Sequence, residues 1–227
     1  MKILDVDGPL MKFLGNAFDF FMLFILTVIL SIPVITAGAA MTSCMYVGMK
    51  IHRKEAPAVF SSYFRAFKEN FKQATLLWLI QLVFIGFVLF DWSYVYQIGW
   101  GNIHVFYRVL LIVASLVVLF YNLTVYAVIA RFDVKMFTAM KTAFVLSMAN
   151  FPFLFLTVLM VGVTAFLCLW FFNFLPAFFV IGFTSATAFH TWIMKNACEK
   201  LKAKAEQFAQ ENENAEKVDE NGQNENA

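Results

Sequence analysis

Charged residues are scarce in this chain of 227 residues: Asp, Glu, Lys and Arg make up 14%, and the formal net charge is +2 at pH 7. Hydrophobic residues make up 61%, far above the roughly 45–50% that is usual in soluble domains. The basic residues form no patch, and no nucleic-acid-binding motif is present. We therefore expect one helical membrane domain, with membrane lipids and not nucleic acid as its surroundings.

The residues that usually carry chemistry are also few. The three cysteines, Cys44, Cys168 and Cys198, have no regular spacing, so they predict neither a disulfide framework nor a metal site. The three histidines fall on different predicted sides or depths of the membrane, and no Glu-x-x-His, nucleophile or phosphate-loop motif occurs. We expect no catalytic residue, no metal and no cofactor, and thus a protein that is not an enzyme.

The first apolar run contains a break. From Asn16 to Ile51 it is about 36 residues long, roughly 54 Å as a single helix, which exceeds the ~30 Å hydrocarbon core of a bilayer. Pro33 ends a helix near Ser31. Thr36 can then cap a second helix by accepting from its first amides, and Gly38 with its neighbouring alanines lets the two helices pack closely. A tight helical hairpin is the favoured interpretation, and a proline kink in one tilted helix is the alternative.

The remaining apolar runs predict an all-α, polytopic membrane protein with six transmembrane helices, the first two forming this Pro-broken hairpin. Two further stretches have the pattern of amphipathic helices that lie at the membrane interface. The expected transmembrane helices are 13–31, 37–52, 71–90, 103 or 105–130, 150–172 and 176–195, and the expected interfacial helices are 57–70 and 134–149.

The first interfacial helix carries aromatic residues at helical spacing, with basic residues mostly on its other faces. On the inner leaflet, the rings would enter the acyl boundary and the cations would face anionic headgroups. A docking surface for a cytoplasmic partner is the alternative. The residues of this candidate lipid or partner surface are Phe60, Phe64, Phe67, Arg65, Lys68 and Lys72.

Polar residues inside the expected spans are few: Asp19, Gln81 and Asn122 are the candidates. Asp19 is costly if it faces lipid, so it should point into the bundle or toward the headgroups. A loop expected at 91–102 is dense in aromatic and hydrogen-bonding groups. Asp91, Trp92 and Trp100 there could belong to an interfacial aromatic belt, or they could contact a saccharide through stacking and hydrogen bonds.

Two segments of the chain resemble each other. Residues 64–78 and 144–158 each place a phenylalanine six residues before an Asn-Phe pair that opens an expected membrane helix. The pattern indicates a parallel repeat of an amphipathic helix followed by two spans.

Residues 1–195 form the expected membrane domain. From Asn196 the composition changes, and the acidic, Asn- and Gln-rich residues 196–227 predict a largely disordered cytoplasmic tail. With six spans, all of the 17 Lys and Arg residues except Arg108 fall on one side. By the positive-inside rule both termini are cytoplasmic.

Several blocks of the sequence resemble the YesL family of bacterial membrane proteins, which has no assigned activity. They are Asp19, residues 31–40 around Pro33 and Gly38, residues 64–74, the Arg131-Phe-Asp133 triplet and Asn150-Phe-Pro152. The similarity covers roughly residues 10–195. It implies a multi-pass protein of the cytoplasmic membrane in Gram-positive bacteria, encoded beside saccharide uptake transporters, two-component regulators and glycan-degrading enzymes.

Two functions follow from these observations. The resemblance implies an accessory or regulatory partner in carbohydrate, chiefly oligosaccharide, uptake that binds a saccharide ABC transporter or a sensor protein. A small-solute transporter acting on its own is the alternative. A carrier is expected to gather polar or ionisable groups at the bilayer midplane, and Gln81, Asn122, Thr124 and His190 are few for that purpose.

Overall fold

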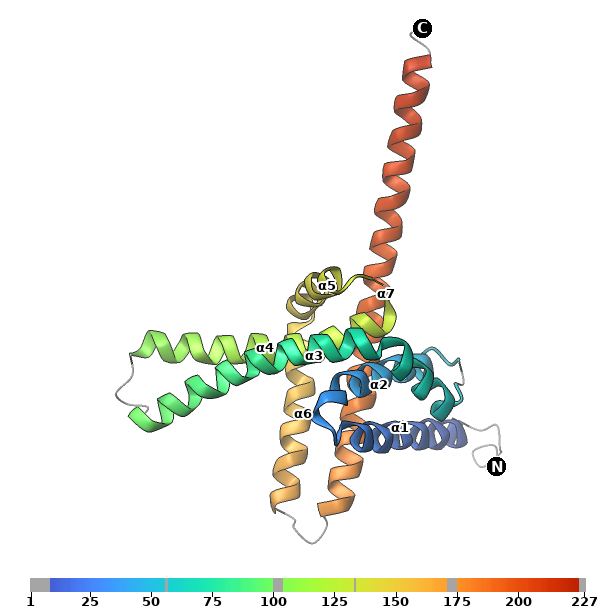
Figure 1. Cartoon of the computed structure of the whole chain (residues 1–227). Helices are drawn as coiled ribbons and strands as arrows, with labels where there is room; N and C mark the ends of the chain where they lie inside the picture. Colours follow the sequence, from blue (N-terminus) through green and yellow to red (C-terminus); the bar gives the residue numbers. More distant parts are fainter. Residues whose placement is uncertain (1–8, 56, 100–103, 133, 171–174, 225–227) are drawn as a thin grey trace.

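A computed structural model describes residues 9–55, 57–99, 104–132, 134–170 and 175–224, and within these ranges the protein is all-helical. Figure 1 shows two long helical pairs, α3 with α4 and α6 with α7, that project in different directions from a centre where α1 and α2 also pack. The helices are α1 (Pro9–Ser31), the short 3-10 helix η1 (Val34–Thr36), α2 (Ala37–His52), α3 (Val59–Ile98), α4 (Val105–Arg131), α5 (Met136–Ala149), α6 (Phe151–Trp170) and α7 (Leu175–Asn224).

Helix α2 occupies the centre. Of its apolar window 61% is buried, against 17% for α1 and α3 and 28% for α4. Its small residues permit this position, because they let neighbouring helices approach closely. A Cβ atom on Gly38 would lie 2.6 Å from both the Ala74 carbonyl oxygen and Trp78 Cβ of α3, and one on Gly48 would lie 2.6 Å from Thr191 of α7. The two glycines therefore set the distance from α2 to α3 and to α7.

The turn at Pro33 separates α1 from α2. Helix α1 ends at Ser31, Pro33 is extended (φ −72°, ψ 111°), and α2 begins at Ala37. The capping prediction for Thr36 is wrong: its backbone is already helical (φ −88°, ψ −5°), and its side chain makes no cap hydrogen bond. The hydroxyl instead lies 2.5 Å from the Leu30 carbonyl oxygen and 2.8 Å from that of Pro33, so it ties the turn back to α1.

Helix α3 runs for 40 residues without interruption, about 60 Å at 1.5 Å per residue. The expected interfacial helix at 57–70 and the expected span at 71–90 are thus one helix, because no proline or glycine interrupts the chain at residues 70–72. The expected loop is also helical as far as Ile98. This part of α3 still packs beside α4, because Trp92 Nε1 donates to Ser115 Oγ at 3.0 Å.

The fifth and sixth helices meet at a sharp corner. Helix α5 ends at Ala149, α6 begins at Phe151, and the two are bent by 83°. Asn150 belongs to both: its side-chain amide donates to the Leu146 carbonyl (2.9 Å), and its own carbonyl accepts from the amides of Phe153 (3.1 Å) and Leu154 (3.0 Å). The bounds agree with an expected helix at 134–149 and a new helix that opens at Asn150.

Helix α7 continues to Asn224, where the sequence predicted a disordered tail from residue 196 onward. Residues in this part are rich in Ala, Glu, Lys and Gln, which favour helices intrinsically. Ion pairs at four-residue spacing add to this, Lys195 with Glu199 and Lys202 with Glu206, each at 3.7 Å. Intrinsic helix propensity thus accounts for the length of α7.

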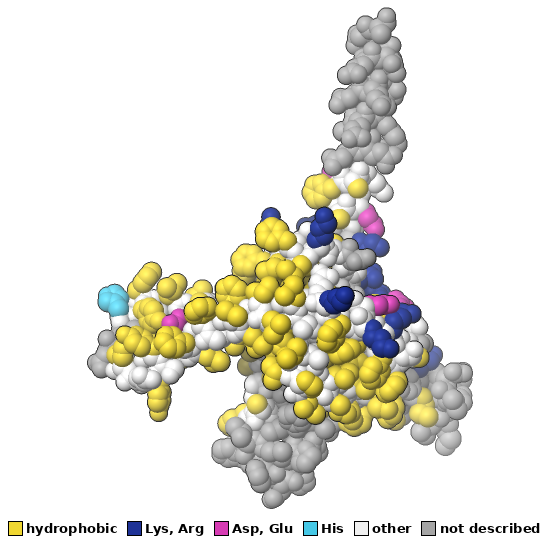
Figure 2. Space-filling model, viewed as in Figure 1, with side chains coloured by type: hydrophobic (Ala, Val, Ile, Leu, Met, Phe, Trp, Pro, Cys, Tyr) yellow, Lys and Arg dark blue, Asp and Glu magenta, His cyan; other side chains and the backbone are white. Residues whose placement is uncertain are grey.

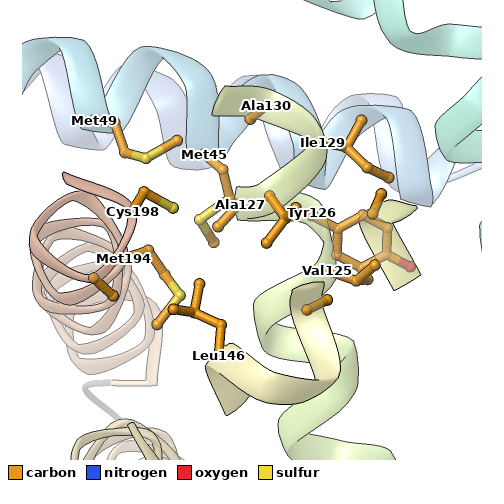
Figure 3. Close-up of a cluster of buried hydrophobic side chains, with 14 of the residues drawn as sticks. Met45, Met49, Val125, Tyr126, Ala127, Ile129, Ala130, Leu146, Met194 and Cys198 are labelled. Atoms are coloured by element: carbon orange, nitrogen blue, oxygen red, sulfur yellow. The ribbon is translucent and has the colours of Figure 1, made fainter. Parts of the chain in front are cut away.

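The core gathers where α2, α4, α5 and α7 meet. Figure 3 shows the sulfur-containing side chains of Met45, Met49, Met194 and Cys198 facing Ala127 and Leu146. Methionine fills irregular gaps between helices that cross at different angles. Burial raises the pKa of the Cys198 thiol to about 12, so it remains protonated and acts as a small apolar residue.

Within the described residues, four helical stretches are long and apolar enough to cross a membrane: α1, η1 together with α2, α3 and α4. The bent pair of α5 and α6 makes a fifth if it counts as one crossing. The chain is therefore an all-helical protein with several helices compatible with a multi-pass membrane protein. Figure 2 shows many hydrophobic side chains along the visible face of α3 and α4.

Candidate functional site

The first half of α3 presents the predicted aromatic and basic surface, which we call the α3 face. Phe60 is 66% exposed, and its ring lies 4.8 Å from that of Phe64. Arg65 forms an ion pair with Glu69 at 3.9 Å and donates to the Tyr46 hydroxyl at 3.3 Å. The other basic residues of the surface, Lys68 and Lys72, are exposed.

Phe67 belongs to this surface only in part. It is half-buried. It packs against a second, smaller cluster of buried side chains, which contains Tyr63 and Phe20. Its ring also contacts that of Phe71 at 5.4 Å. Phe67 therefore supports the position of α3, while Phe60 and Phe64 are the aromatic side chains that a lipid or a partner protein could contact.

Two of the three predicted intramembrane polar residues come together. Gln81 and Asn122 both line a groove of about 580 Å³ between α3, α4 and α5, which we call the α3–α4–α5 groove. Gln81 is 4% exposed and its carbonyl oxygen accepts from the Tyr126 hydroxyl, while its amide nitrogen is buried with no partner. Tyr121, whose hydroxyl is likewise buried and unpaired, lines the same groove.

The other predicted residues lie elsewhere. Asp19 is partly exposed on α1 and does not line this groove. Asp91 and Trp92 lie in the last two turns of α3, so they are helical residues at the far end of the α3–α4 pair and not members of a loop. Trp100 falls outside the described residues. Pro33 and Gly38 hold the turn and the α2–α3 contact described above.

Sequence reasoning missed Tyr63. Its side chain is fully buried, its hydroxyl donates to the Ala40 carbonyl at 3.0 Å, and it lies 3.2 Å from the Thr27 hydroxyl. It thus joins α1, α2 and α3. The sequence did contain a sign of this role. Tyr63 stands among phenylalanines in the aromatic stripe, and a tyrosine hydroxyl must find a hydrogen-bond partner when it is buried.

Two histidine contacts, from half-buried His52 and buried His190, were also unexpected. His52 Nε2 donates to the Ala188 carbonyl at 2.8 Å, and His190 Nε2 donates to the Leu123 carbonyl at 3.0 Å, so both tie α7 to the centre. His190, Thr27, Ser31 and Thr157 line a cavity of about 510 Å³ where α1, α2, α4, α6 and α7 converge, which we call the central cavity.

The buried polar residues of the described part of the chain are Thr, Ser, Gln and His; no Asp, Glu, Lys or Arg is among them. The same residues contain no group of three or more His, Cys, Asp or Glu that could hold a metal ion. The interior is therefore suited to helix packing and to neutral hydrogen-bonding ligands.

Comparison with known proteins gives one match. No curated protein and no solved structure matches the chain. One protein-family model does match a segment of the chain. This segment runs from α1 through the turn at Pro33 and α2 into α3 as far as Trp92. It therefore contains the α3 face and Gln81 but none of α4 to α7. Residues 20–92 match the model of a family described as "Protein of unknown function, DUF624".

Proposed function

We propose that this protein is an accessory or regulatory partner in oligosaccharide uptake, which acts through a saccharide ABC transporter or a sensor protein and has no catalytic activity of its own. The observation that carries the proposal is the α3 face: exposed Phe60 and half-buried Phe64 beside the cations Arg65, Lys68 and Lys72. Aromatic and arginine side chains are enriched at protein interfaces, which favours Phe60, Phe64 and Arg65 as the contact residues. The resemblance to the YesL family supplies the carbohydrate context.

The proposed topology has six spans in the cytoplasmic membrane of a Gram-positive bacterium, with both termini cytoplasmic. It is supported by the charge distribution along the chain. On the face seen in Figure 2, Lys and Arg side chains gather around the base of α7 and near the α2–α3 connection, away from the tip of the α3–α4 pair.

Cysteine labelling tests this topology. In a variant without the native cysteines, an impermeant reagent added outside should modify Tyr96→Cys, a position that is 89% exposed near the tip. Lys68→Cys on the α3 face should react only after the membrane is opened. Reaction of Lys68→Cys in intact cells would place the α3 face outside and remove the cytoplasmic partner.

Co-purification tests the partner. The double variant Phe60→Ala/Phe64→Ala should lose a saccharide transporter subunit that the wild type retains, and oligosaccharide uptake by the cells should fall. The matched control is Phe84→Ala/Phe87→Ala, which removes two exposed rings from the apolar second half of α3 (57% and 66% exposed). Equal loss in both variants would show that general destabilisation, and not the α3 face, is responsible.

A small-solute transporter is the second candidate, and the central cavity favours it. A volume of about 510 Å³ lies in the range of small-molecule sites. The decisive measurement is entry of labelled oligosaccharide into liposomes that contain only this purified protein. Uptake that falls in Ser31→Ala, which removes a buried hydroxyl without a partner from the cavity wall, would establish the carrier and contradict the accessory role.

A further inference from the structure

A second groove, about 490 Å³ in volume, lies between α5 and the part of α7 that follows its apolar residues. We call it the lysine groove. Its walls include the apolar side chains of Val145, Leu146 and Leu201, and three lysines line it: Lys141 from α5, and Lys200 and Lys204 from α7. Among the described residues that form it, none is acidic.

The three lysines are not neutralised by the rest of the described chain. Lys200 and Lys204 are four residues apart, so they lie on the same face of α7. The neighbouring acidic residues pair elsewhere: Glu199 with Lys195 and Glu206 with Lys202. Lys141 lies over the Phe137 ring, 4.6 Å from its centroid, and like the other two it forms no ion pair with a described carboxylate. The groove therefore carries three unpaired positive charges.

The corner at Asn150 gives the height of this groove in the membrane. If α6 crosses the bilayer, the 83° bend makes α5 lie almost parallel to the membrane surface. Helices α6 and α7 run side by side (Figure 1), and the groove lies at the end where α6 begins and the apolar part of α7 gives way to lysines. That is the level of the lipid headgroups on the side where the other basic residues gather.

We propose that the lysine groove binds the headgroup of an anionic phospholipid of the inner leaflet. Its phosphate would sit among Lys141, Lys200 and Lys204, because basic pockets between helices at the cytoplasmic surface suit such headgroups. Lys141 and Val145 also line the α3–α4–α5 groove, so apolar surface for the acyl chains is adjacent. The inference rests on the proposed crossing by α6 and not on the proposed role in uptake.

Lipid retention by the purified full-length protein tests this inference. In a neutral detergent, the protein is titrated with phosphatidylglycerol or with phosphatidylcholine of the same acyl chains, and bound lipid is counted by native mass spectrometry. We expect phosphatidylglycerol to bind more tightly. Since each lysine near a membrane surface contributes about fivefold to affinity for anionic lipid, Lys200→Gln/Lys204→Gln should lose at least tenfold, and Lys141→Gln less.

The matched control is Lys135→Gln/Lys202→Gln. It also removes two positive charges, one just before α5 and one from α7, at residues that do not line the groove. Comparable loss in this control, or equal binding of the two lipids, would overturn the proposal. Tight binding of glycerol phosphate, which lacks acyl chains, would assign the site to a soluble anion instead. Neither result depends on whether the cells take up oligosaccharide, so failure here is distinguishable from failure of the accessory role.

Discussion

Two Asn-Phe pairs in this protein occupy similar sequence contexts and have different structures. At Asn70-Phe71 the helix continues, and α3 extends from Val59 to Ile98. At Asn150-Phe151 one helix ends and another begins at 83°. Both asparagine side chains make the same hydrogen bond to the carbonyl four residues earlier, Asn70 to Ala66 at 3.0 Å and Asn150 to Leu146 at 2.9 Å.

The difference lies in the next residue. Lys72 follows the first pair, and Pro152 follows the second. A proline at this position has no amide proton to donate to the carbonyl of Met148, and its ring would collide with that carbonyl in a continuous helix. One residue thus decides whether an amphipathic segment and the following apolar segment form one rod or two helices at an angle. Four experiments test this comparison.

The largest effect is expected from Lys72→Pro, which makes the first junction resemble the second. Proline inside a helix costs about 3 kcal/mol or more, so the unfolding temperature in detergent should fall strongly. Spin labels at Ser61 and Leu79 should report a distance that drops from about 27 Å, the length of 18 helical residues, toward about 20 Å. Lys72→Ala is the control, and an unchanged distance in Lys72→Pro would show that α3 is kept straight by its neighbours.

Gly38→Leu should come next. The backbone of α3 just beyond Asn70 is held against α2 at this glycine, where a Cβ would already lie 2.6 Å from the Ala74 oxygen and from Trp78 Cβ. Overpacking there should cost about 2 to 3 kcal/mol of unfolding free energy. Gly86→Leu is the matched control, since nothing lies within 4 Å of a Cβ at Gly86. If both variants unfold alike, close packing of α2 on α3 is not what fixes this part of α3.

A smaller change is expected from Pro152→Ala, which restores the missing amide proton. Labels at Lys141 and Leu159, placed like those at the first junction, should be about 20 Å apart in the wild type. In the variant, a second population at about 27 Å should appear as α5 and α6 join. A single short distance would mean that the Phe151 ring, 4.9 Å from that of Phe120, holds the corner without the proline.

The smallest effects should come from the asparagines themselves. Asn150→Ala removes a hydrogen bond at a helix end and should cost about 1 kcal/mol of stability. Asn70→Ala removes the same bond inside a helix, where alanine is the better helix former, so the net loss should stay below about 0.5 kcal/mol. Thermal unfolding of the two variants side by side measures the difference, and equal losses would contradict it.

Much of the helix pattern could be predicted from the sequence, because proline and apolar periodicity act locally. The boundaries at Ser31, Ala37 and Asn150 follow from Pro33 and Pro152. The length of α3 was missed because a change from amphipathic to apolar composition was taken as a helix boundary, although no residue at Asn70-Phe71 breaks a helix.

The candidate sites were predictable only as residue types. Gln81 and Asn122 stood out because polar residues in an apolar run need a partner. Gln81 meets Asn122 and Tyr121 in one groove because α3 packs beside α4, and Lys141 shares a groove with Lys200 and Lys204 because α5 packs beside α7. Those contacts join residues about 40 to 60 positions apart in the chain, and local sequence patterns do not determine them.

The central place of α2 has a consequence for synthesis on the ribosome. Helix α2 is made before α7, yet its Gly48 packs against Thr191 of α7. Until α7 has been made, one flank of α2 stays without its neighbour, and the chain cannot complete its centre. A chain that stops before Thr191 would present that incomplete flank to the proteases that remove unassembled membrane proteins.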